Sequence, residues 1–178
     1  MEDKQKKLDL VRDSIGSYPD FPKPGILFRD IFGVLRNPKA SECLFELILE
    51  EVKKLPSIDI VVGLDSRGFL FGPVIALKLG IPFVPVRKRG KLPGKVQQVA
   101  FVLEYGQDVL ELQEDSIKPG QKILVVDDLL ATGGTMEASC KLISQVGGEL
   151  VGCLAIIELI DLQGRKKLNA PVTSIIQY

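Results

Sequence analysis

The stretch KILVVDDLLATGGTM, residues 122–136, reads as a strand, an acid pair, a loop and the start of a helix. Residues 122–126 form an aliphatic run, which is typical of a strand buried on both faces of a parallel sheet. Asp127 and Asp128 follow at the carboxyl end of that strand, where open α/β sheets bind their ligands. Positions 129–134 form a turn rich in small residues, and an amphipathic run comes next. The stretch therefore predicts one β-loop-α unit with polar chemistry at its turn.

The loop of this unit suits a phosphate at one end and a sugar at the other. Gly133 and Gly134 allow conformations that direct successive N–H groups to one point, and a helix N-terminus adds partial positive charge. Thr132 and Thr135 offer hydroxyl donors to the same anion, whereas the acid pair only accepts and so suits two ribose hydroxyls. The loop lacks the lysine of a P-loop and the glycine spacing of a dinucleotide fingerprint. A ribose 5-phosphate is the simplest ligand, and the alternative is an acidic turn that caps a helix.

Composition sets bounds on the class of protein. The chain has 178 residues, 46% of them hydrophobic, which is enough for one domain with a full core. Its 23 basic and 23 acidic residues balance, so overall charge favours neither nucleic acid nor a membrane surface as a partner. The lack of histidine excludes Ser-His and Cys-His catalysis and histidine-ligated zinc. Three dispersed cysteines, with no apolar leader or spanning segment, predict a soluble, cytoplasmic protein with reduced thiols.

Two further strands are predicted to end in residues suited to anions. The run 58–64 leads into Asp65, Ser66 and Arg67, where an arginine in a tight loop can bind an anion through its bidentate fork. The next predicted strand leads into residues 87–95, which hold five cations in nine positions. Taken alone, the first loop reads equally well as a polar turn, and the second as a solvated face. The downstream loop favours the anion reading, with a polyphosphate as ligand and a mobile segment that closes over it.

Hydrophobic periodicity predicts the remaining elements. The proline-rich stretch SYPDFPKPG at 17–25 excludes a regular helix or a central strand, so a shaped loop is expected. Asn37 is expected to cap the helix that follows it. The expected helices are 3–15, 38–55, 69–78 and the run after the glycines. The expected strands are 26–28, 58–64, 81–86, 96–103, 108–113, 122–126, 150–158 and 172–176, the last at the sheet edge.

Five motifs resemble those of one enzyme family. They read PDFPKPGILFRDI at 19–31, GLDSRGFLFGP at 63–73, RKRGKLPG at 87–94, LEYG at 103–106 and VVDDLLATGGT at 125–135. Their order and spacing are similar to those of the adenine phosphoribosyltransferases, within the type I phosphoribosyltransferase family, from about residue 15 onward. The proline-rich segment and LEYG distinguish this branch from its orotate, hypoxanthine-guanine and xanthine relatives.

The resemblance implies a fold, a reaction and partners. The fold is a single α/β domain over 1–178 with a mostly parallel central sheet flanked by helices, a lid hairpin at about 87–113 and an N-terminal hood at about 1–35. The reaction joins adenine to phosphoribosyl pyrophosphate and gives AMP and pyrophosphate. Mg²⁺ is the expected cofactor, held mainly through substrate and water with no direct protein cage. A homodimer is expected, with no nucleic-acid or membrane partner.

The resemblance also assigns roles to individual residues. Glu104 is expected to handle the proton at adenine N7 and Tyr105 to close the lid. Leu27 and Arg29 are expected to line the adenine pocket largely through their backbone, with Leu159 near the base. Three groups of residues are expected at phosphoribosyl pyrophosphate: Asp127 and Asp128 at the ribose hydroxyls, Ala131, Thr132, Gly133, Gly134 and Thr135 at the 5-phosphate, and Asp65, Ser66, Arg67, Arg87, Lys88 and Lys91 at the pyrophosphate. Arg67 and Arg87 are expected to be catalytic alongside Glu104.

Two alternatives stay open at this level. A phosphoribosyltransferase fold also serves as a non-catalytic sensor of phosphoribosyl pyrophosphate in repressors that carry a DNA-binding module. This chain shows no such module, and its clustered cations lie at the expected ligand site. The second alternative changes the base, because pattern and spacing do not distinguish a 6-amino purine from a 6-oxo purine. The preference for adenine follows from the resemblance.

Overall fold

The computed structural model describes the backbone of residues 2–103 and 106–178, and the side chains of 2–101 and 108–178. The chain forms two compact units, residues 1–54 and 55–178, and each buries its own set of apolar side chains. The expectation of one domain over the whole chain stays a prediction. Within the described ranges, no helix has the length and apolar character needed to cross a lipid bilayer.

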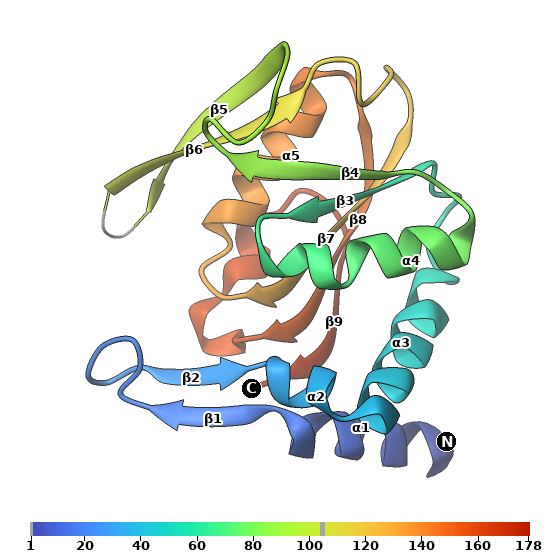
Figure 1. Ribbon diagram of the computed structural model, residues 1–178, viewed down its shortest axis with the longest axis vertical. Coiled ribbons are helices and arrows are strands. Elements are labelled where there is room, and N and C mark those ends of the chain that lie inside the picture. Colours follow the sequence, from blue (N-terminus) through green and yellow to red (C-terminus); the bar gives the residue numbers. More distant parts are fainter. Residues whose placement is uncertain (1, 104–105) are drawn as a thin grey trace. The chain divides into compact units, whose positions relative to one another are not determined.

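The first unit combines three helices with a two-stranded ribbon (Figure 1). Its elements are α1 Glu2–Ser14, β1 Gly16–Pro19, β2 Leu27–Asp30, α2 Phe32–Arg36 and α3 Pro38–Val52. The two strands pair antiparallel, with Gly16 opposite Asp30. The predicted loop over 17–25 is therefore wrong at its first three residues, which belong to the ribbon. α2 has no counterpart among the predicted elements.

Asn37 caps α3, as the sequence predicts. Its side-chain oxygen accepts hydrogen bonds from the backbone N–H of Lys39 at 3.2 Å and of Ala40 at 3.3 Å. Pro38 occupies the first helical position, where its missing N–H loses no hydrogen bond. The helix ends at Val52, three residues earlier than the apolar periodicity predicts.

The second unit is built on a seven-stranded sheet with the order β5-β6-β4-β3-β7-β8-β9. Its strands are β3 Ile60–Leu64, β4 Phe83–Lys88, β5 Val96–Leu103, β6 Gly106–Gln113, β7 Lys122–Leu130, β8 Glu149–Glu158 and β9 Val172–Gln177. The five strands β4, β3, β7, β8 and β9 run parallel, whereas β5 and β6 form an antiparallel hairpin that joins the sheet through β4. The mostly parallel α/β class and the edge position of β9 are confirmed.

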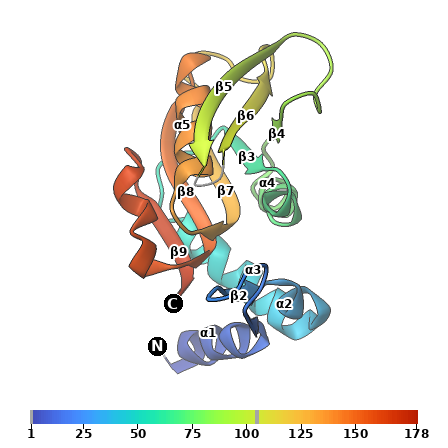
Figure 2. The same ribbon diagram turned by 90° about the vertical axis from the view of Figure 1, so that its left-hand side faces the viewer.

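Helices cover both faces of this sheet. α4 Gly72–Leu79 connects β3 to β4, and α5 Gly134–Gln145 connects β7 to β8. The two helices lie on opposite faces of the sheet (Figure 2). The β3–α4–β4 and β7–α5–β8 connections start from neighbouring strands and move across the sheet in opposite directions, so right-handed crossovers place their helices on opposite faces. All five residues of β3 are buried, which explains its uniformly apolar sequence. Three short 3₁₀ turns complete the unit: η1 Arg67–Leu70, η2 Ile160–Leu162 and η3 Gly164–Lys167.

Tertiary contacts that extend a strand or tighten a turn account for three of the differences between the predicted and observed boundaries. β7 continues to Leu130, which pairs with Glu158 on β8, so the loop begins later than predicted. β4 continues through Arg87 and Lys88, which pair with β6, so both cations belong to a strand rather than to the predicted loop. The helix predicted from residue 69 starts at Gly72, after the tighter turn η1.

Candidate functional site

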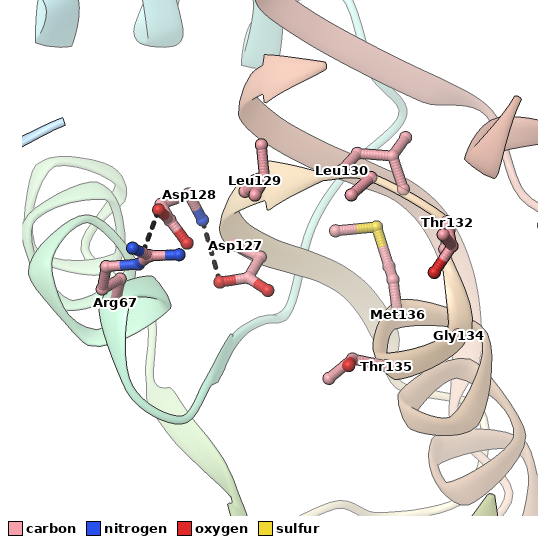
Figure 3. A pocket seen from close by; sticks show the side chains of 11 residues that line it. Arg67, Asp127, Asp128, Leu129, Leu130, Thr132, Gly134, Thr135 and Met136 are labelled. Carbon is pink, nitrogen blue, oxygen red and sulfur yellow. Dashed lines mark hydrogen bonds and ion pairs between the residues drawn. The ribbon is translucent and has the colours of Figure 1, made fainter. Parts of the chain in front are cut away.

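The candidate site lies where the chain leaves the sheet in opposite directions. From β3 the chain passes through α4 to β4, and from the neighbouring β7 it passes through α5 to β8. The loops after β3 and β7 therefore diverge and leave a crevice at the carboxyl edge, where open α/β sheets bind ligands. A cavity of about 210 Å³ lies there, lined by Arg67 and residues 127–136 (Figure 3).

Residues 131–135, called the glycine loop here, form one wall of this cavity. Gly133 has a φ of +80°, a left-handed conformation that favours glycine. A Cβ added to it would lie 2.5 Å from the carbonyl oxygen of Gly164, so the close backbone approach also excludes a side chain. α5 begins at Gly134, which brings the partial positive charge of its N-terminus to the cavity wall beside Thr132 and Thr135. The glycine loop thus supplies the groups that an anion requires.

The acid pair lies near the end of β7, where Asp128 is buried and Asp127 is partly buried. The N–H of Asp128 donates to Oδ1 of Asp127 at 2.9 Å, and Oδ2 of Asp128 lies 2.8 Å from Nε of Arg67 (Figure 3). Burial raises the pKa of Asp127 well above its usual range, and the neighbouring charge of Asp128 raises it further. Burial also raises the pKa of Asp128, while Arg67 opposes that rise. Two full negative charges are therefore costly here, and hydroxyl donors or a cation would satisfy them.

Arg67 reaches the acid pair because its loop packs directly on β7. A Cβ added to Gly68 would lie 2.6 Å from the carbonyl oxygen of Val126, so a side chain at this position would push the two segments apart. The loop enters through a cis peptide between Asp65 and Ser66 and turns at once into η1. The turn after β3 thus places a guanidinium beside the acids of β7.

Two cations from β4 and its following loop converge on Asp65. Nε of Arg87 lies 3.0 Å and Nζ of Lys91 lies 3.5 Å from Oδ2 of Asp65. Lys88 instead pairs with Asp108 on β6 at 2.9 Å, because neighbouring residues of a strand project to opposite faces. The fold therefore brings Arg87 and Lys91 to the loop after β3 and directs Lys88 onto the hairpin.

Glu111 is a buried acid that the sequence reasoning missed. It is 1% exposed, and its carboxylate accepts hydrogen bonds from the N–H groups of Lys91 and Leu92, each at 2.7 Å. The side-chain amide of Gln98 donates to it at 3.2 Å. Glu111 therefore holds the turn that carries Lys91. In the sequence it stands between two leucines on a predicted strand, a position with no signal of its own.

Glu158, the last residue of β8, is a second missed acid. It is 2% exposed, and its carboxylate accepts hydrogen bonds from Nε of Arg165 at 2.6 Å and from Oγ of Ser174 at 2.6 Å. The guanidinium of Arg165 holds the pKa of Glu158 below its usual range despite burial. An acid at the end of a buried aliphatic run is the same signal that identified Asp127, so the sequence did contain the information.

The residues expected at the base lie in different parts of the chain. Leu27 and Arg29 belong to β2 of the first unit, where Nη1 of Arg29 donates to a serine hydroxyl of β1 at 2.6 Å. Leu159 directly follows β8, and its N–H donates to the last carbonyl of β7 at 2.9 Å. Glu104 and Tyr105 fall outside the described residues. The roles of these five residues at adenine stay predictions.

The chain is similar to known proteins over almost its whole length. Residues 36–177 match the phosphoribosyl transferase domain family. The adenine phosphoribosyltransferase of Drosophila pseudoobscura pseudoobscura is 51% identical over 175 residues, which cover 98% of this chain and 97% of that protein. The solved adenine phosphoribosyltransferase of Saccharomyces cerevisiae, complexed with an imino-altritol bisphosphate and adenine, has a TM-score of 0.91 at 42% identity, covering 96% of this chain and 99% of its own.

More distant relatives retain the same fold. The solved adenine phosphoribosyltransferase of Trypanosoma brucei, in complex with AMP, pyrophosphate and ribose-5-phosphate, has a TM-score of 0.87 at 27% identity, covering 96% of this chain and 79% of its own. These structures confirm the predicted type I phosphoribosyltransferase fold. On its sequence, its fold and the chemistry of its cavity, the chain belongs to the phosphoribosyl transferase family and, within it, to the adenine phosphoribosyltransferases.

Proposed function

We propose that this chain transfers the 5-phosphoribosyl group from phosphoribosyl pyrophosphate to adenine, giving AMP and pyrophosphate in purine salvage. The observation that carries the proposal is the meeting of the glycine loop, the acid pair and Arg67 at one cavity. Phosphoribosyl pyrophosphate offers a 5-phosphate for the loop, two hydroxyl donors for the acids and a diphosphate for the cations. Relatives named for this activity are 51% and 49% identical over nearly the full chain.

The sugar phosphate binds along the carboxyl end of β7. Residues 131–135 take the 5-phosphate through backbone N–H groups, the threonine hydroxyls and the N-terminus of α5. Asp127 and Asp128 accept hydrogen bonds from the two ribose hydroxyls. The left-handed conformation of Gly133 and the low exposure of Asp128 support this arrangement, because both features serve a ligand of mixed anionic and hydroxyl character.

The diphosphate binds the cations that gather at the loop after β3. Arg67 and Arg87 are the principal groups, with Lys91 and the turn of residues 65–66 beside them. The convergence of Arg87 and Lys91 on Asp65 supports this assignment. The assignment of Lys88 to the diphosphate follows from the family resemblance alone, since its ammonium pairs with Asp108 on β6. Positive groups that are fixed before the reaction stabilise the negative charge that develops on the departing diphosphate.

The reaction itself is a displacement at the anomeric carbon. The N9 lone pair of adenine forms the new bond to C1 while the C1–O bond breaks and its electrons leave with pyrophosphate. Glu104 takes the proton at N7, which shifts electron density toward N9 and contributes about 10²-fold or more to the rate. Leu27, Arg29 and Leu159 hold the base in line, and Tyr105 closes the lid. A chain without histidine suits this chemistry, since no covalent nucleophile is needed.

Magnesium fits this donor set as an ion held largely by the substrate. Asp127 and Asp128 supply hard carboxylate oxygens at the cavity. Among the described residues there is no cluster of three or more Asp, Glu, His or Cys that could form a protein cage. When bound, Mg²⁺ neutralises diphosphate charge, and it retains several waters. The chain's own residues then orient the ribose and receive the leaving group.

We also propose a cytoplasmic homodimer. The cytoplasmic assignment rests on the free cysteines, of which Cys140 and Cys153 are buried thiols suited to a reducing compartment. The dimer follows from the family resemblance alone. Light scattering coupled to size exclusion checks the assembly, and a mass of one chain would remove the dimer from the proposal.

AMP formation from adenine and phosphoribosyl pyrophosphate with Mg²⁺ tests the proposed function. We expect turnover by the wild type, loss of turnover in the folded double variant Asp127→Asn/Asp128→Asn, and no change in Asp115→Asn, an exposed acid away from the cavity. Hypoxanthine and guanine compete poorly if adenine is the base. A wild type that binds phosphoribosyl pyrophosphate without converting any of the three bases would instead support the sensor alternative.

A further inference from the structure

The backbone of the glycine loop packs directly against the backbone around Gly164, with no side chain between the two segments. Residues 160–167, called the backing segment here, come after β8 and contain η2 and η3. A Cβ added to Gly164 would lie 2.2 Å from the carbonyl oxygen of Ala131 and 2.9 Å from the nitrogen of Gly133. A Cβ added to Gly133 would in turn lie 2.5 Å from the carbonyl oxygen of Gly164. The position of Gly164 therefore limits where the glycine loop can lie.

An ion pair at the next residue fixes the backing segment to the sheet. Nε and Nη2 of Arg165 donate to the two carboxylate oxygens of Glu158 at 2.6 and 2.5 Å, a bidentate arrangement. The same carboxylate accepts hydrogen bonds from Ser174 at 2.6 Å and from Gln177 at 3.2 Å, both on β9. Glu158 is 2% exposed, which strengthens the hydrogen bonds to its carboxylate, whereas the Arg165 side chain that reaches it is 44% exposed. One buried carboxylate thus joins β8, β9 and the backing segment.

We propose that Glu158 and Arg165 are positioning residues for the 5-phosphate site. Their ion pair holds Gly164 against Ala131 and Gly133, so that the N–H groups of the glycine loop converge before a ligand arrives. Arg165 lies outside the residues that line the cavity and acts through Gly164. The inference rests on the proposed function, which assigns the 5-phosphate to the glycine loop. A role confined to stabilising edge strand β9 is the competing explanation.

The test separates positioning from simple stability. Arg165→Gln removes the charge and the fork, Arg165→Lys keeps the charge but loses the bidentate geometry, and Lys166→Gln changes the next residue, whose ammonium donates to Gln163 on the surface. Calorimetry measures the Kd of ribose 5-phosphate for each folded variant, and steady-state kinetics give the KM values for phosphoribosyl pyrophosphate and adenine. Thermal melting reports stability independently.

We expect Arg165→Gln to raise the Kd of ribose 5-phosphate and the KM of phosphoribosyl pyrophosphate together by about tenfold or more, because small displacements of a preorganised site are expensive. The KM for adenine and all values for Lys166→Gln stay within about twofold of wild type. Arg165→Lys shows a smaller increase of about threefold, and it carries the test if Arg165→Gln does not fold.

Two results would overturn the inference in different ways. A wild type that binds no ribose 5-phosphate would refute the assignment of the glycine loop and the inference with it. A wild type that binds ribose 5-phosphate, with Arg165 variants that melt at lower temperature yet bind it equally tightly, would refute the positioning role alone. In that case the ion pair serves the edge of the sheet and the proposed function stands.

Discussion

The two adjacent glycines of the glycine loop provide a matched test of the local structure. Gly133 has a φ of +80° and a carbonyl oxygen 2.5 Å from the place where a Cβ would lie. Gly134 begins α5 and has no atom within 4 Å of its own Cβ position. Substitution by alanine adds the same methyl group at both positions, so any difference between the two variants reports backbone conformation and space.

The expected magnitudes follow from these two environments. A left-handed conformation costs a residue with a Cβ about 1–2 kcal/mol. The overlap with Gly164 adds about 1–3 kcal/mol, because the obstacle is a backbone carbonyl that cannot change rotamer. Gly133→Ala is therefore expected to lower the free energy of unfolding by about 2–5 kcal/mol. Gly134→Ala is expected to be neutral or to stabilise by up to about 1 kcal/mol, since alanine favours a helix.

Urea unfolding, followed by circular dichroism, measures both free energies. The KM for phosphoribosyl pyrophosphate is expected to rise in Gly133→Ala, because relief of the overlap moves the glycine loop away from the backing segment. If Gly133→Ala unfolds at the same urea concentration as Gly134→Ala, with an unchanged slope, the left-handed conformation and the close approach to Gly164 are both refuted.

Two further predictions concern buried acids. Burial raises the pKa of Asp127, so its contribution to stability is present in acid and is lost as pH rises from the ordinary carboxyl value through the raised one. Asp127→Asn is therefore expected to raise the free energy of unfolding at pH 8 by on the order of 1 kcal/mol relative to wild type, as measured by urea unfolding. The same variant is expected to lose turnover. Equal free energies of unfolding at pH 8 would contradict the raised pKa. Burial alone would raise the pKa of Glu111, but hydrogen bonds from the backbone N–H groups of residues 90–92 and from the amide of Gln98 outweigh burial and lower the pKa. The contribution of Glu111 to stability is therefore present above the ordinary pKa of a glutamate, and it is lost as pH falls through the lowered pKa. Glu111→Gln is expected to lower the free energy of unfolding by about 2 kcal/mol at pH 7. The difference between wild type and variant should disappear below pH 4 when urea midpoints are measured across a pH series. A difference that does not change with pH would refute the charge-dependent role.

The predictions from sequence were most successful where local chemistry is strong. Asn37 caps α3 because its side chain and the following proline act within one turn. The buried strands were found because a strand covered on both faces needs an uninterrupted apolar run. Strand ends were less well predicted. β7 extends to Leu130 because β8 continues to pair with it, a contact that no local pattern encodes.

The same division applies to the candidate site. Asp127, Asp128 and the glycine loop were identified from one stretch because ligand chemistry and strand end coincide there. Glu111 was missed because its partners are backbone groups of a turn that lies about twenty residues earlier in the chain. Glu158 stood in a recognisable position, but its partner Arg165 read only as part of a polar turn.

The sequence by itself determined the class of the fold, the β-loop-α unit at 122–136 and the hydrogen-bonding groups that its turn carries. These features depend on residues that are neighbours in the chain, so periodicity and residue type reveal them. The tertiary structure alone decided that β3 lies beside β7, which brings Arg67 to Asp128. It also decided that Gly164 supports the glycine loop. Both contacts join segments that are distant in the chain. The strand order brings the first pair together and the close approach of two backbones the second, and no local pattern in a single sequence predicts either.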